Sequence, residues 1–166
     1  MATAIKLIDP AENEFLASLE AKTKRPSHFF RAMAHRPEVL RNFPPLYTAV
    51  VGPGPVPRRV KALVYLACSY TNTCAFCIAG NLPGARKAGI ADDEIRALEA
   101  GKDDAFPPAE RAAIAYAREL TKTAHAESTR GELRSHYNDE QIVEITLVIG
   151  ISNLTNRFNN GLGILP

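Results

Sequence analysis

The chain has 166 residues, the length of one ordinary domain, and a chain of this size buries roughly 70% of the surface that its unfolded form exposes. Hydrophobic residues make up 46% and charged residues 23%, as in soluble globular proteins. With 20 Lys and Arg against 18 Asp and Glu, the net charge is only +2. Intrinsic disorder, collagen-like repeats and dedicated nucleic-acid binding are therefore disfavoured.

The sequence contains no signal for a membrane or for export. No stretch approaches the roughly 18–20 uninterrupted apolar residues that span a bilayer. The N-terminal MATAIKLIDPAENEF lacks the apolar core and the small-residue cleavage site of a secretory signal. We expect a cytoplasmic protein with no membrane partner, in which cysteines stay reduced unless they take part in redox chemistry.

Helix-start signals recur along the chain. Asp9 is a candidate N-cap, followed by Pro10 at the first helical position and by Glu12 three residues after the cap. Further starts are predicted at Pro37, at Pro57, at Pro107 with Pro108, and at a capping-box pattern over residues 138–141. Helix stops are predicted at Gly52, Gly89, Gly101 and Gly161.

Hydrophobic spacing also indicates helices. Between residues 57 and 71 one stripe of helical period contains Val60, Leu63, Val64, Ala67, Cys68 and Thr71. From residue 139 to about 160 apolar residues cover more than one face, as in a helix in a core or at a subunit interface. A buried strand over residues 146–151 is the alternative. We predict an all-α fold, because alternating strand patterns are otherwise absent.

The stiffest segment is Gly-Pro-Gly-Pro-Val-Pro at residues 52–57. It links an N-terminal helical part, residues 8–51, to a core over residues 57–164. Each part alone is short for independent folding, so we predict one domain over residues 1–166.

The chemistry is expected at Cys74 and Cys77. Asn72 and Thr73 are N-cap residue types, so a helix should begin at about Cys74, with the two cysteines one turn apart on the same face. Unpaired N–H groups and the helix dipole at such a start lower a thiol's pKa toward neutrality. A peroxide can oxidise one sulfur, and the other can then resolve it into a disulfide.

Two other interpretations of the cysteines stay open. One is a zinc site made by a histidine with Cys68, Cys74 and Cys77. The position of Cys68 argues against it, because this residue lies in the apolar stripe of the preceding helix and should point into the core. Alternatively both cysteines of the pair are inert buried side chains, as free cysteines often are. For Cys68 itself we predict a core thiol, and we expect no metal and no cofactor.

These segments resemble the carboxymuconolactone decarboxylase / AhpD-like alkylhydroperoxidase superfamily over most of residues 38–164. The likeness is carried by PRRVKALVYLA at residues 57–67, by the CxxC at residues 74–77, by AGI at 88–90, by EITLVIG at 144–150 and by NRF at 156–158. The resemblance implies an AhpD-like helical bundle that assembles as a dimer, trimer or hexamer. It also implies reduction of a small hydroperoxide or disulfide by Cys77, with Cys74 resolving and an unidentified thiol as reductant. The decarboxylase branch commonly lacks the cysteine pair.

The sequence departs from the family's peroxidase motif at two positions. Where the family has a glutamate and a histidine that relay a proton away from the second cysteine, this chain has Ala62 and Asn81. Neither side chain titrates usefully, and general-base help is typically worth about 10²–10⁴-fold in rate. In addition, Pro83 with Gly84 is expected to kink or end the helix just beyond Asn81.

No other residue emerges from the sequence as a substitute base. The four histidines are expected to face solvent or to cap helices: His28, His35, His125 and His136. Three functions remain. The first is a dithiol peroxidase or disulfide reductase, and the second is a weakened, oligomeric member that senses redox state or binds a small molecule. The third is lactone or small-acid chemistry, in which a carboxylate would be held by Arg58, Arg59 and Arg157.

Overall fold

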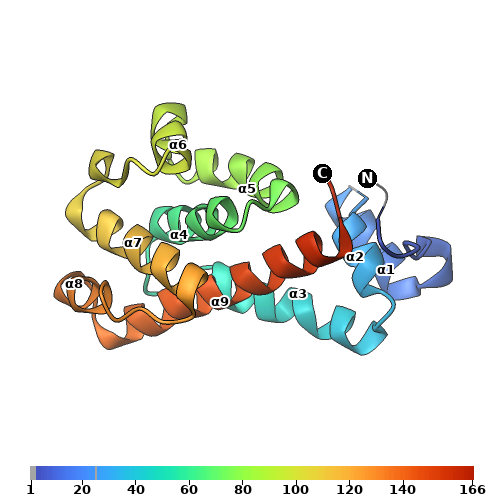
Figure 1. The fold of residues 1–166 in the computed structure, drawn as a ribbon. Coiled ribbons are helices and arrows are strands. Elements are labelled where there is room, and N and C mark those ends of the chain that lie inside the picture. Colours follow the sequence, from blue (N-terminus) through green and yellow to red (C-terminus); the bar gives the residue numbers. More distant parts are fainter. Residues whose placement is uncertain (1–2, 25) are drawn as a thin grey trace.

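The computed structural model of the chain describes residues 3–24 and 26–166. Over these residues it is all helical with no strand, which confirms the predicted fold class (Figure 1). The α-helices are α1 (Glu14–Thr23), α2 (His28–Met33), α3 (Pro37–Val51), α4 (Arg58–Thr71), α5 (Ala75–Lys87), α6 (Asp92–Glu99), α7 (Pro108–Thr123), α8 (Arg130–His136) and α9 (Asp139–Leu162). Residues 146–151, where a strand was the alternative, lie inside α9.

Helix α4 is the centre of the core. It packs against α5, α7 and α9, and its buried residues include the whole run from Leu63 to Ser69 (Figure 1). A helix that is buried nearly all round must be covered on several sides, and these three helices supply that cover. Helix α4 therefore fixes where α5 begins relative to α9.

The N-terminal helices close one end of the molecule. Helix α3 packs along α9, and α1 and α2 lie near the C-terminal end of α9 (Figure 1). The ring of Phe29 on α2 meets Phe43 on α3 and Phe158 on α9 edge-on, with centroids 5.2 and 5.3 Å apart. Edge-on pairs suit the quadrupoles of aromatic rings. This aromatic cluster stands beside the first turns of α5.

Several predicted helix ends are confirmed. Asn138 caps α9 in a capping box with Gln141, and Pro37 and Pro108 occupy first turns. Two predictions were wrong. Pro10 opens only a 3₁₀ turn over Pro10–Glu12, because the next helix has a better cap in Asn13. Helix α9 continues past Gly161 to Leu162 and ends at Gly163, whose φ of 64° is the left-handed cap that glycine accommodates.

Helix α5 also runs through Pro83 to Lys87, so the predicted stop beyond Asn81 was wrong, and a kink there stays a prediction. A proline removes the hydrogen bond to the carbonyl four residues earlier, which here belongs to Ala79. Ala79 is exposed, so water can satisfy that carbonyl, and packing against α4 and α9 holds the rest of the helix. Residues 3–24 and 26–166 contain no helix with the length and hydrophobicity needed to cross a bilayer.

Candidate functional site

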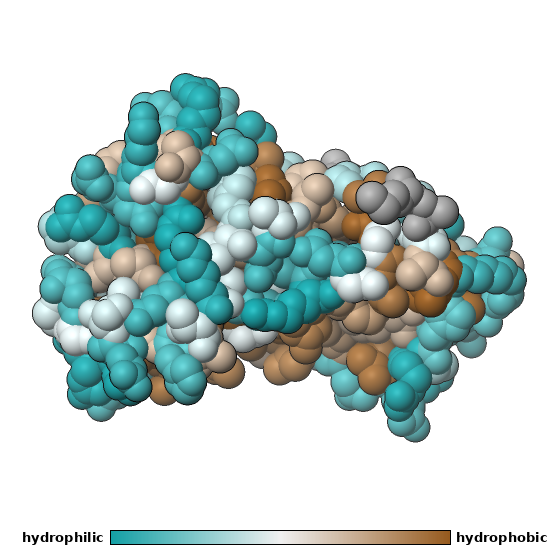
Figure 2. Space-filling model, viewed as in Figure 1, coloured by the Kyte–Doolittle hydropathy of each residue, from teal (hydrophilic) through white to brown (hydrophobic). Residues whose placement is uncertain are grey.

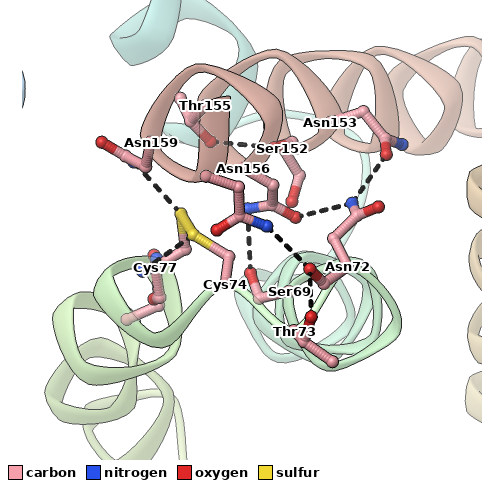
Figure 3. The surroundings of a disulfide bond; sticks show 12 residues. Ser69, Asn72, Thr73, Cys74, Cys77, Ser152, Asn153, Thr155, Asn156 and Asn159 are labelled. Carbon is pink, nitrogen blue, oxygen red and sulfur yellow. Dashed lines mark hydrogen bonds between the residues drawn. A yellow bond between two sulfur atoms is a disulfide. The ribbon is translucent and has the colours of Figure 1, made fainter. Parts of the chain in front are cut away.

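Cys74 and Cys77 form a disulfide at the N-terminus of α5, with Cα atoms 5.3 Å apart (Figure 3). Thr73 takes a left-handed φ of 50°, which turns the chain sharply between α4 and α5. The predicted caps were wrong, because Asn72 ends α4 and Cys74 itself caps α5. The Cys74 Sγ accepts a hydrogen bond from the Cys77 N–H, at 3.3 Å. Of the two sulfurs, that of Cys74 therefore receives a hydrogen bond from a backbone N–H group at the helix start.

The two sulfurs differ in their access to space. Cys77 lines a cavity of about 380 Å³, whereas the fully buried Cys74 is absent from its walls. Six aromatic rings line this cavity: Phe29, Phe30, Phe43, Tyr47, Tyr65 and Phe76. No Asp, Glu, Lys, Arg or His is among the described residues of its walls. We call this space the sulfur cavity; an uncharged apolar molecule fits it.

The two tyrosines of the sulfur cavity are not bases. Burial raises the pKa of Tyr65 well above its usual range, and burial also raises the pKa of Tyr47. The Tyr65 hydroxyl shares a hydrogen bond of 2.7 Å with the Thr155 hydroxyl on α9. Both phenols therefore stay neutral around physiological pH.

Ala62 and Asn81, the two relay positions, lie together in the wall of a neighbouring cavity of about 640 Å³. We call it the relay cavity. Asn81 lines both cavities, and in the sulfur cavity it lies beside Cys77. However, the Asn81 Nδ2 donates to the Cys77 backbone carbonyl, at 2.7 Å, and not to its sulfur.

The group that does bond to the Cys77 sulfur is Asn159 of α9, whose Nδ2 donates to Sγ at 3.3 Å (Figure 3). Sequence reasoning missed this residue. A neighbouring amide, Asn156, donates to the Ser69 hydroxyl and accepts from Asn72, which ties the end of α4 to α9. Three amides spaced three residues apart in the second half of this helix were the available signal: Asn153, Asn156 and Asn159.

The relay cavity has an ion pair in its wall that sequence reasoning also missed. Lys61 is only 2% exposed, and its ammonium bonds to the Glu144 carboxylate and to the Gly52 carbonyl, the latter at 2.7 Å. The second Glu144 oxygen accepts from the Val56 N–H at 2.7 Å. A Cβ at Gly54 would meet the Glu144 carboxylate, so a larger residue there would displace that side chain from its present position. The pair holds this turn against α4 and α9.

Cys68 confirms the prediction of a core thiol. It is fully buried on α4 and accepts a hydrogen bond from the Thr121 hydroxyl at 3.3 Å. Burial raises its pKa to about 11, so it stays a thiol at neutral pH. In the part of the chain that the structure describes, no three His, Cys, Asp or Glu side chains group closely enough to hold a metal.

The remaining predicted candidates lie elsewhere. All four histidines are exposed, and none lines either cavity. Arg59 bonds to Glu110 and Glu94, which hold its pKa above the usual range, and thereby joins α4 to α6 and α7. Arg157 bonds to Asn153 and to the Thr121 carbonyl, and Arg58 lines the relay cavity. Arg59 and Arg157 are thus held by separate partners, and Arg58 is exposed at the relay cavity.

Comparison with known proteins identifies the family. Residues 37–119 match the carboxymuconolactone decarboxylase family. The uncharacterized protein YdfG of Bacillus subtilis (strain 168) is 31% identical over 110 residues, which are 64% of this chain and 75% of that protein.

Solved structures share the fold. A protein of unknown function from Agrobacterium tumefaciens, described as a putative antioxidant defence protein AhpD, is 28% identical with a TM-score of 0.74, over 81% of this chain and 95% of that one. A peroxidase-related AhpD-core protein from Ralstonia eutropha JMP134 has a TM-score of 0.84 at 21% identity, over 99% and 92% of the two chains. The chain belongs to the carboxymuconolactone decarboxylase family and has its AhpD-like fold.

Proposed function

We propose that this protein is an AhpD-like thiol peroxidase that reduces small organic hydroperoxides through Cys77 and Cys74. The observation that carries the proposal is the asymmetry of the pair. Two cysteines close enough to form a disulfide lie at a helix start, and only Cys77 lines a cavity. The likeness to proteins described as peroxidase-related and as a putative antioxidant AhpD supports the same activity.

The reaction has two steps. The Cys77 thiolate attacks the hydroperoxide oxygen that bears the hydrogen, the O–O bond breaks, and the alkoxide leaves and takes a proton to become an alcohol. The Cys74 thiolate then attacks the sulfenic acid sulfur, which forms the disulfide and releases water. A small dithiol returns both electrons and protons to the pair.

The helix start assists the second step. Its N–H group already points at the Cys74 Sγ, so an anionic sulfur at Cys74 would gain a charge-assisted hydrogen bond and the favourable end of the helix dipole. A resolving cysteine must attack as a thiolate. This arrangement supports the assignment of Cys74 as the resolving residue and of Cys77 as the residue that meets substrate.

Turnover should be slow, because neither relay position nor any residue of the sulfur cavity offers a general base. This favours one alternative, a weakened member of the family that senses redox state or binds a small molecule. In that case the pair would oxidise once without efficient cycling, and the oxidised form would differ in ligand affinity or assembly.

We also propose a cytoplasmic homo-oligomer. Apolar side chains that are about half exposed lie on α3 and α9: Val39, Leu46, Val143, Leu147 and Leu154. Figure 2 shows hydrophobic surface along the region where these two helices lie in Figure 1. A second copy could bury such a strip. Light scattering should show a mass above one chain, and Leu147→Glu should lower it; an unchanged mass would count against this interface.

The peroxidase proposal is tested by steady-state reduction of cumene hydroperoxide with dithiothreitol as the reductant. We expect wild type to turn over and Cys77→Ser to fall to the uncatalysed rate. Cys68→Ala is the matched control, because it removes a thiol that faces no cavity, and it should stay within about twofold of wild type. Equal rates for wild type and Cys77→Ser would overturn the proposal.

A further inference from the structure

The Asn159 amide lies buried against the reactive sulfur. Its side chain comes from α9, is 1% exposed, and lines the sulfur cavity beside Cys77. One end of the amide, Nδ2, donates to the Cys77 Sγ at 3.3 Å. The other end, Oδ1, is buried and has no hydrogen-bond partner among the described residues. Figure 3 shows this oxygen turned away from the disulfide.

A buried acceptor without a partner calls for an explanation, because nearly all buried polar groups in proteins are paired. The other buried amide of α9 has a partner at each end: Asn156 donates to Ser69 and accepts from Asn72. Asn159, in contrast, lines the cavity and bonds to the sulfur. The Asn159 Oδ1 is therefore an acceptor for which a bound ligand would supply the missing hydrogen-bond donor.

We propose that Asn159 is a positioning residue that both stabilises the Cys77 thiolate and receives the substrate. Its Nδ2–H stabilises the Cys77 thiolate, and its Oδ1 accepts the hydrogen bond of the hydroperoxyl O–H. This inference rests on the peroxidase activity proposed above. It specifies the substrate as an uncharged molecule with an apolar body and one O–H donor at its reactive end.

The first chemical step sets what this contact must do. The oxygen that the thiolate attacks is the one that bears the hydrogen, so its O–H must donate to Oδ1 while that oxygen lies near the sulfur. Because Oδ1 is buried and turned away from the disulfide (Figure 3), the substrate reaches it when the amide group turns toward the cavity. Asn159 moves no proton, so it positions and stabilises but does not replace a general base. The other titratable groups near Cys77 are Cys74, Tyr47 and Tyr65, and burial keeps both phenols neutral.

The first test isolates the Cys77 thiol in a Cys74→Ser background and follows thiolate absorbance against pH. Asn159→Leu, which keeps the size and removes both polar ends, should move the titration midpoint of Cys77 upward by about one pH unit, a tenfold loss of thiolate at pH 7. Asn156→Leu is the matched control, because it removes a buried amide of the same helix that touches no sulfur, and its midpoint should not move. Asn159→Ala is made in parallel in case the leucine variant does not fold.

The second test separates the two ends of the amide. Above the midpoint, where Cys77 is fully ionised in every variant, we compare its reaction with cumene hydroperoxide and with methyl methanethiosulfonate, which has no hydrogen-bond donor. Asn159→Leu should slow the hydroperoxide reaction about tenfold and leave the thiosulfonate reaction unchanged. Equal slowing of both reactions would overturn the substrate contact, and an unmoved midpoint would overturn the contact with the thiolate. Absence of steady-state turnover in wild type would defeat the peroxidase proposal alone, since the two tests use a pH titration and a single oxidation or thiolation of Cys77.

Discussion

Two cavities adjoin at Asn81, and they differ in chemical character. The sulfur cavity is aromatic, contains Cys77 and has no charged side chain among its described walls. The relay cavity contains Ala62 and the buried Lys61, but no sulfur. In the relay cavity Lys61 is bound in an ion pair with Glu144, and Arg58 is exposed. The Cys77 sulfur, in contrast, accepts a hydrogen bond from a neutral amide, that of Asn159. Membership of the family does not by itself supply the proton transfer expected of its peroxidase branch.

The largest expected effect is on stability and concerns the ion pair of the relay cavity. Lys61→Met leaves the Glu144 carboxylate without its partner, so the free energy of unfolding should fall by about 3–5 kcal/mol. Urea unfolding measures the loss. The double variant Lys61→Met with Glu144→Leu should recover much of it, because no buried charge is then unpaired. A folded Lys61→Met as stable as wild type would show that the pair does not hold this cavity together.

Cys68, a buried thiol that lines neither cavity, should make the stability of the protein depend on pH. The pKa of Cys68 is raised from 9.0 to about 11 by burial, so the folded state holds its proton more tightly than the unfolded chain does. The stability from this group is fully present below about pH 9 and is lost as the pH rises toward 11. Over that window wild type should lose about 3 kcal/mol more than Cys68→Ala. Parallel curves for the two proteins between pH 9 and 11 would contradict the assigned environment.

Restoring the missing glutamate and histidine in the relay cavity should speed the peroxidase reaction at Cys77. Ala62→Glu with Asn81→His places a carboxylate and an imidazole in the relay cavity beside Cys77, and peroxide turnover should rise about 10–100-fold. Each single variant should gain less, because a base needs its orienting partner. The rate constant kcat with cumene hydroperoxide measures the gain. A double variant that folds but is no faster would show that proton transfer does not limit this site.

The smallest expected effect concerns the apolar wall of the sulfur cavity. Phe76→Ala removes a ring next to Cys77, so KM for cumene hydroperoxide should rise about tenfold through lost apolar contact. Hydrogen peroxide is too small to use that contact, and its rate should change little. The ratio of kcat/KM for the two substrates reports the difference. Equal losses with both would indicate damage to Cys77 and not to substrate binding.

The features that could be predicted from the sequence are those that neighbouring residues decide. The capping box at Asn138, the stripe that buries Cys68 and the placement of the CxxC at a helix start all follow from spacings within one or two turns. The resemblance added the correct family and fold.

The features that were missed depend on contacts between distant residues. Asn159 and Cys77 are 82 residues apart in the sequence, and Lys61 and Glu144 are 83 apart, so neither pair follows from local spacing. The cap at Cys74 was missed because Asn72 and Thr73 are better cap residue types. The sharp turn at Thr73, and not intrinsic preference, decides which residue precedes the helix.

The central claim is that the hydroperoxide oxidises Cys77 to a sulfenic acid, and that Cys74 then attacks this sulfenic acid to form the disulfide. The most direct measurement treats the fully reduced protein with one equivalent of cumene hydroperoxide and maps the product by mass spectrometry. We predict a Cys74–Cys77 disulfide, one equivalent of the alcohol, a reduced Cys68, and a sulfenic acid trapped on Cys77 when Cys74 is replaced by serine. A sulfenic acid on Cys74 in a Cys77→Ser protein at an equal rate, or a dithiol that the hydroperoxide leaves intact, would contradict the account.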